Sequence, residues 1–185
     1  MPAAGKDASL FKSFLEEIEK TLDIKKTIEV LGIGEGEAKV FLRSVLSRLF
    51  PQTERLIIYV DGASRGNPGK AGAGAVIKGA DGRVVKEIRK SLGVATNNVA
   101  EYMALITALT DARDMGGKSV HVFADSELIV KQINGEYRVK SEGLKTLYQK
   151  VIAIKGDFSE FRITHIPREK NKEADTLANA AIDGV

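Results

Sequence analysis

The chain of 185 residues contains no cysteine. Disulfide bonds and thiolate metal sites are therefore excluded. No stretch is long and apolar enough for a membrane span, and the N-terminus lacks the basic-then-apolar layout of a signal peptide. We therefore expect a cytoplasmic protein that has no membrane partner.

The chain also lacks a strong charge of either sign. Its 28 basic and 25 acidic side chains leave a net charge of +3. Residues 1–55 carry nine side chains of each sign, so the small basic surplus lies in the remainder. This surplus permits a nucleic-acid partner but does not require one. The hydrophobic content of 43% is ordinary for a soluble domain with a buried core.

The first 52 residues differ in pattern from the rest. Apolar side chains recur at helical spacing through residues 8–50, and "PQTER" (51–55) follows as a joint. About fifty residues without disulfides are marginal as an independent fold. We therefore expect residues 1–52 to form a helical accessory segment that mediates self-association or docks on a protein, and residues 53–185 to form the main domain.

One short stretch of the accessory segment leaves a second interpretation open. "LGIGEGEAKVFL" (31–42) faintly resembles a helix-hairpin-helix, in which backbone N–H groups hold a nucleic-acid phosphate. Glu35 and Glu37 flank the turn and oppose phosphate binding by their charge. We therefore favour packing over phosphate contact as the role of this segment.

From residue 55 onward the pattern changes to strands and strand–helix units. Apolar and alternating runs predict strands at 55–62, 71–79, 83–93, 119–126 and 160–167. Helical patterns fall at 97–114, 126–134, 142–154 and 169–182. Ala80-Asp81-Gly82 is typical of a hairpin turn. Hairpin-linked strands followed by strand–helix units predict an α/β fold with a mixed sheet flanked by helices.

Four carboxylates fall on faces that otherwise look buried: Asp61, Glu101, Asp125 and Asp175. Two of them follow apolar strand sequence, namely "LIIYV" and "VHVFA", and the other two lie on the apolar faces of predicted helices. Clustered buried carboxylates are costly to ionise, and a divalent cation offsets this cost. Oxygen ligands without cysteine favour Mg²⁺ or Mn²⁺.

Each acid taken singly has a simpler explanation. It could be a turn residue, a helix cap or one half of a salt bridge, but four such placements together disfavour that explanation. The two strand-end acids also suit the crevice beyond the carboxyl ends of neighbouring parallel strands. The sequence therefore predicts a metal site at that edge of the sheet.

Four segments carry a family resemblance, in order and approximate spacing. They are "DGASRGNPG" (61–69), "TNNVAEY" (96–102), "ADSELIVKQINGEY" (124–137) and "HIPREKNKEADTLA" (165–178). Together they resemble the signatures of type 1 ribonuclease H over residues 56–183. "QINGEYRVK" is more similar to the compact members than to those with a Trp-rich basic protrusion. The resemblance implies a five-stranded mixed sheet flanked by helices, and hydrolysis of the RNA strand in RNA–DNA hybrids.

The resemblance also assigns roles to individual residues. Asp61, Glu101, Asp125 and Asp175 match the four metal-binding acids of the family, and Asp61 is expected on the central strand as the bridging ligand. His165 matches the histidine of the mobile loop, which implies proton shuttling or product release. The implied contacts to nucleic acid come from four further positions: Gly62, Asn67, Thr96 and Asn97. His121 lies inside a strand and is interpreted as structural.

The implied chemistry uses two Mg²⁺ or Mn²⁺ ions that straddle the scissile phosphate, about 3.5–4 Å apart. One activates a water and the other stabilises the leaving 3′-oxygen, so the products carry 5′-phosphate and 3′-hydroxyl ends. Selection of RNA depends on the 2′-hydroxyl, and double-stranded RNA is a second possible partner. Two alternatives stay open: a hybrid- or duplex-binding module with dispensable nuclease chemistry, and a DNA nuclease or transposase-like enzyme with a related sheet.

Overall fold

The computed structural model describes residues 13, 16–17, 23–39, 42 and 55–184. The chain divides into two compact units, Met1–Pro51 and Gln52–Val185. None of the helices in the described part of the chain has the length and apolar character that a bilayer crossing requires. Of the helical pattern predicted over residues 8–50, the parts at 8–22 and 43–50 lie almost entirely outside the described residues.

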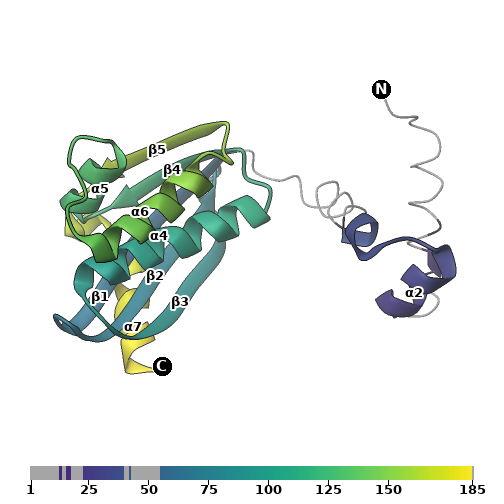
Figure 1. Cartoon of the computed structure of the whole chain (residues 1–185), viewed down its shortest axis with the longest axis horizontal. Coiled ribbons are helices and arrows are strands. Elements are labelled where there is room, and N and C mark those ends of the chain that lie inside the picture. Colours follow the sequence, from purple (N-terminus) through teal and green to yellow (C-terminus); the bar gives the residue numbers. More distant parts are fainter. Residues whose placement is uncertain (1–12, 14–15, 18–22, 40–41, 43–54, 185) are drawn as a thin grey trace. The chain divides into compact units, whose positions relative to one another are not determined.

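The second unit is built on a five-stranded mixed sheet (Figure 1). Its strand order is β3-β2-β1-β4-β5, which makes β1 the central strand, as predicted. The first three strands pair antiparallel, whereas β4 pairs parallel with both β1 and β5. The strands are β1 (Arg55–Gly66), β2 (Gly69–Gly79), β3 (Val84–Ala95), β4 (Ser119–Ala124) and β5 (Glu160–His165).

Strand β1 continues beyond the point where the sequence predicted its end. Asp61 does not close the strand: β1 runs on to Gly66, and its register with β2 extends from Leu56↔Gly79 to Gly66↔Gly69. The small residues of "GAS" and "AGAGA" allow this continued pairing. The parallel pairing with β4, however, ends at Val60↔Ala124. The two strands therefore stop pairing directly before Asp61 and Asp125.

Two helices cover one face of the sheet and form the main core with it. They are α4 (Asn97–Asp114) and α6 (Glu142–Lys155), with the short α5 (Glu127–Ile133) beside them (Figure 1). Thr96 caps α4, since its side chain accepts a hydrogen bond from the N–H of Val99. Buried residues on α4 recur at helical spacing and pack on β1 and β2: Ala100, Ala104, Leu105, Ala108, Leu109 and Ala112.

The last helix covers the opposite face and lies very close to β2. A Cβ atom on Gly74 would lie 2.3 Å from the backbone oxygen of Ala174, so only glycine permits this approach. The sequence predicted one continuous helix over 169–182, which is wrong at its start. A 3₁₀ turn, η1 (Arg168–Lys170), precedes α7 (Lys172–Asp183), and Asn171 separates them. The side chain of Asn171 is hydrogen-bonded to the backbone of β1, which fixes this break.

The face of the sheet on the α7 side is less buried than the sequence predicted. Tyr59, His121 and Phe123 are half-buried there, whereas Ile58, Val60 and Val122 on the other face are fully buried. The Tyr59 and Phe123 rings stack with centroids 5.2 Å apart. The Nε2 atom of His121 is hydrogen-bonded to the hydroxyl of Thr164, which is consistent with a structural role.

The described part of the first unit is a small helical hairpin. Helix α2 (Ile24–Leu31) is capped by Asp23, and Gly32 ends it in the left-handed conformation. Residues 35–39 are helical again, and Ile33 and Ala38 form a small core. The N–H of Gly34 donates to the Glu37 carboxylate over 3.1 Å, so this amide is occupied by an acid of the chain itself.

Candidate active site

Three of the four predicted acids lie together where β1 and β4 part. Asp61, Glu101 and Asp125 each place a carboxylate oxygen within 4.8 Å of the other two. They come from β1, from α4 and from the residue after β4, so the cluster forms only when these elements are assembled. Asp61 and Glu101 are 5% and 6% exposed, while Asp125 is half-buried. Three of the four acids predicted to gather thus do so, and Asp175 is not in this group.

Glu101 reaches the cluster because β1 carries a glycine opposite it. A Cβ atom on Gly62 would lie 2.1 Å from the backbone nitrogen of Glu101, so any side chain there would displace α4. The N–H of Gly62 also hydrogen-bonds the Glu101 carboxylate. Gly62 was predicted as a contact to nucleic acid, but the structure buries it against α4 with its amide already engaged.

The cluster holds more negative charge than its surroundings compensate. Burial, followed by the charges of Asp125 and Asp175, raises the pKa of Asp61 to about 7. Burial and the charges of Asp61 and Asp125 raise the pKa of Glu101 well above its usual value. The Arg168 guanidinium acts in the opposite direction on both groups but does not cancel these effects.

Asp175 lies at the margin of the cluster and has its own cation. Its carboxylate forms an ion pair with Arg168, and its side chain is 25% exposed. Asn179, one helical turn later, donates to the same carboxylate over 3.3 Å. The charge of Asp175 nevertheless contributes to the raised pKa of Asp61, so the two acids share one electrostatic environment.

His165 is exposed at the end of β5. Within the described residues, no hydrogen bond or ion pair joins its ring to the four acids. It lies near Glu127, whose pKa is lowered first by its bond to Lys131 and to a smaller extent by His165. The structure therefore places His165 on the α5 side of the cluster, at the start of the segment that leads to Arg168.

The other predicted contacts to nucleic acid gather at the start of α4. The Asn67 Oδ1 atom accepts a hydrogen bond from the N–H of Asn97 over 3.1 Å, which ties the β1–β2 turn to the helix. Thr96 caps the same helix. Asn67 and Asn97 are exposed, so their remaining polar atoms face solvent.

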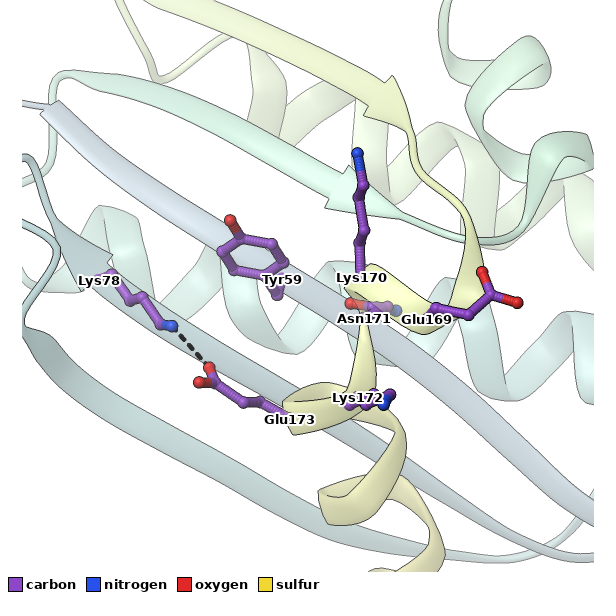
Figure 2. Close-up of a pocket in the computed structure, with 7 residues that line it drawn as sticks. All are labelled: Tyr59, Lys78, Glu169, Lys170, Asn171, Lys172 and Glu173. Carbon is purple, nitrogen blue, oxygen red and sulfur yellow. Dashed lines mark ion pairs between the residues drawn. The ribbon is translucent and has the colours of Figure 1, made fainter.

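Two residues at the site were not among those predicted. Arg168 pairs with Asp175, and Asn171 donates from Nδ2 to the Asp125 carboxylate over 3.1 Å. Both lie in "PREKN", between His165 and Asp175. The sequence feature that could have identified them is the position of this polar segment directly before the helix that carries Asp175. Asn171 also lines a pocket of about 220 Å³ beside Tyr59 and Lys78 (Figure 2).

The acid cluster fits a hard divalent cation. The converging donors are carboxylate oxygens, which Mg²⁺ and Mn²⁺ prefer. The raised pKa values of Asp61 and Glu101 indicate that a further positive charge would stabilise their ionised forms.

Comparison with known proteins defines the class of the second unit. Residues 59–181 match the family model described as "Reverse transcriptase-like". The compost-metagenome RNase H1 LC11, solved in complex with an RNA/DNA hybrid, is 47% identical and superposes with a TM-score of 0.67. That match covers 70% of this chain and 97% of the LC11 chain.

Curated relatives agree with this class. Ribonuclease HI of Halobacterium salinarum is 43% identical over 129 residues, or 70% of this chain and 65% of that protein. The bifunctional protein Rv2228c of Mycobacterium tuberculosis is 44% identical over 130 residues, or 70% of this chain and 36% of that protein. The chain thus spans about a third of the mycobacterial relative. The chain belongs to the type 1 ribonuclease H family.

Proposed function

We propose that this protein is a metal-dependent endonuclease that hydrolyses the RNA strand of RNA–DNA hybrids. The observation that carries the proposal is the convergence of Asp61, Glu101 and Asp125 with raised pKa values at Asp61 and Glu101. A module that only binds nucleic acid would be better served without this negative charge beside the phosphates. The LC11 complex with an RNA/DNA hybrid supports the same substrate for this chain.

The four acids would hold two Mg²⁺ or Mn²⁺ ions, with Asp61 as the shared ligand at the centre. When bound, such ions activate a water and stabilise the leaving oxygen of an in-line phosphoryl displacement. The expected products carry 5′-phosphate and 3′-hydroxyl ends. The acids would determine where the ions bind, because β1, α4, the end of β4 and α7 bring their carboxylates to one place.

Asn67, Thr96 and Asn97 would contact the backbone of the hybrid at the start of α4, where Asn67 and Asn97 are exposed and Thr96 is half-buried. His165 would carry a proton or assist product release from the end of β5. Arg168 would keep Asp175 in place and contribute positive charge near the phosphate. Recognition of RNA would depend on its 2′-hydroxyl groups.

The test is incubation with end-labelled RNA–DNA hybrid, double-stranded RNA and double-stranded DNA, each with Mg²⁺, Mn²⁺ or EDTA. We expect cleavage of the RNA strand of the hybrid with either ion, and no cleavage in EDTA. Binding without cleavage would instead support the binding module. Cleavage of DNA would support the related nuclease class, and undiminished cleavage in chelator would exclude the metal mechanism.

We further propose that residues 53–185 form the ribonuclease H domain and that residues 1–52 act through packing. The occupied Gly34 amide supports this, because a phosphate would have to displace the Glu37 carboxylate. A chain that begins at Gln52 should cleave hybrid with similar kcat. Each lost phosphate contact on B-form DNA would change the salt slope of log K by about 0.9. A decrease of one unit or more in the slope, with weaker hybrid affinity, would identify a nucleic-acid arm instead.

A further inference from the structure

Asn171 joins three parts of the site through one residue. Its Nδ2 group donates to the backbone oxygen of Val60 over 2.8 Å and to the Asp125 carboxylate over 3.1 Å. Its backbone oxygen accepts a hydrogen bond from the N–H of Asp175 over 3.0 Å. Val60 directly precedes Asp61 in β1. Asn171 therefore contacts two acids and the strand residue beside a third.

The orientation of the Asn171 amide follows from its neighbours. Both groups near Nδ2 are oxygen acceptors, so the reversed amide would place Oδ1 against two oxygens. In the adopted orientation, Oδ1 is buried and has no hydrogen-bond partner in the described structure. Asn171 is 1% exposed, so Oδ1 is shielded from bulk solvent.

Asn171 also forgoes the usual role of asparagine at its position. It is the N-cap residue of α7, where an asparagine side chain normally accepts a hydrogen bond from the first turn of the helix. No such bond is present at α7. Figure 2 shows Asn171 at the start of α7, in front of the strand that carries Tyr59. Its side chain is thus hydrogen-bonded to β1 and Asp125 and does not cap α7.

We propose that Asn171 is a positioning residue that sets the spacing of Asp61, Asp125 and Asp175 before any ion binds. This inference rests on the proposed function, because it treats these acids as metal ligands. The Nδ2 group fixes the orientation of the Asp125 carboxylate, and the bond to Val60 holds the start of α7 against the central strand. Without the amide, the acids must be brought into place as the ion binds, so the affinity for the ion falls.

A purely structural role predicts a different result. The loss of any buried hydrogen bond lowers the free energy of unfolding. A positioning role additionally weakens the binding of Mn²⁺ to the folded protein. Loss of a group that orients a metal ligand typically weakens metal affinity or activity by about 10–100-fold. Metal affinity without substrate therefore separates the two roles.

The experiment compares Asn171→Ala and Asn171→Ser with Gln132→Ala in the full chain. Serine can cap α7 but lacks the amide. The serine variant therefore allows the test even if the alanine variant does not fold. Gln132 is the matched control, because it is a buried amide (4% exposed) that accepts a hydrogen bond from the Tyr102 hydroxyl over 2.8 Å. Mn²⁺ affinity is measured by calorimetry without nucleic acid, and Tm is measured in EDTA.

We expect both Asn171 variants to bind Mn²⁺ about 10–100-fold more weakly, and Gln132→Ala to lower Tm with unchanged affinity. In cleavage assays, low Mn²⁺ should reduce the kcat of the Asn171 variants at unchanged KM, and high Mn²⁺ should restore it. Unchanged Mn²⁺ affinity in folded Asn171 variants would overturn the inference. If the unsubstituted protein binds Mn²⁺ but cleaves no hybrid, the proposed function fails while the calorimetric test of Asn171 still stands.

Discussion

Two helices on opposite faces of the sheet each bring a carboxylate to the same site, but only one of the two carboxylates has a cation of the chain beside it. Glu101 arrives from α4, is 6% exposed, and has a pKa raised well above its usual value. Asp175 arrives from α7, is 25% exposed at its side chain, and is paired with Arg168. The α4 side therefore holds uncompensated charge, whereas the α7 side brings a cation with its acid.

The difference indicates on which side of the site a bound metal ion would have the larger effect. Asp61 and Glu101 are buried so deeply that a cation from outside the chain would stabilise their ionised forms. Asp175 stays near solvent and its charge is balanced without an ion. We infer that ion binding mainly relieves repulsion on the Asp61–Glu101 side, and that Asp175 can exchange Arg168 for an ion at little cost.

The largest expected effect comes from Asp61, which both sides share. Asp61→Asn would remove a proposed metal ligand worth several kcal/mol of transition-state stabilisation, so hybrid cleavage should fall by about 10³-fold or more. Tm in EDTA should hold or rise, because the substitution removes a carboxylate from a repulsive cluster. A large drop in Tm would show that Asp61 is structural.

The next largest effect is expected for a substitution of His165, which lies on neither α4 nor α7. If it transfers a proton or assists product release, His165→Ala should lower kcat by about 10²-fold. Because its ring has no bond to the four acids within the described residues, Mn²⁺ affinity and hybrid Kd should stay nearly unchanged. A kcat equal to that of the unsubstituted protein would remove His165 from the mechanism.

In EDTA at pH 8, substitutions of the two helix acids should change Tm in opposite directions. Glu101→Gln removes an uncompensated charge, so Tm should rise, by about 2–4 °C for each kcal/mol of relieved repulsion. Asp175→Asn leaves Arg168 without its partner, and an exposed pair is worth only about 0.2–1 kcal/mol, so Tm should fall slightly. Equal shifts for both variants would remove the contrast between the two sides.

The pH dependence of the metal-free protein provides the finest test. Asp61 has an ordinary pKa of 3.8 and a folded pKa of about 7, so the folded chain retains a proton that the unfolded chain releases between these values. The free energy of unfolding in EDTA should therefore fall as the pH rises from about 4 to about 7, by up to about 1.4 kcal/mol per pH unit for each retained proton. Above that range it should level off.

Denaturant unfolding at several pH values measures this slope. Asp61→Asn should flatten it, and saturating Mg²⁺ should reduce or reverse it, because bound ions stabilise the ionised acids. A stability that rises with pH in EDTA between 4 and 7 would contradict the uncompensated cluster.

Alternation along β1 and the strand–helix pattern were sufficient to predict a mixed sheet with acids gathered at its edge, whereas the central position of Asp61 was implied by the family resemblance. The mixed sheet and the gathering of acids follow from the spacing of apolar residues along the chain, which can be read directly from the sequence. The exposure of the α7-side face was missed, since alternation identifies which residues share a face but not what covers it. Only the packing of α7 over β1, β2 and β3 determines that coverage.

The roles of Arg168 and Asn171 could not be predicted for a related reason. A helical pattern over 169–182 is locally favourable, but the bond from Asn171 to Val60 joins residues 111 positions apart. That contact exists only in the folded chain, and it decides where the 3₁₀ turn ends and α7 begins. The pairing of Arg168 with Asp175 likewise depends on the turn between them.

The close fit of α7 on Gly74 has a consequence for changes in chain length. Residues 166–171 set where α7 begins relative to β5, so deleting one of them would disturb the contact of Ala174 with Gly74 and displace Asp175 from the site. The connection 134–141 between α5 and α6 contains none of the four acids. Insertions there should leave the site intact, whereas the length of 166–171 constrains the position of Asp175 as directly as the fold of α7 does.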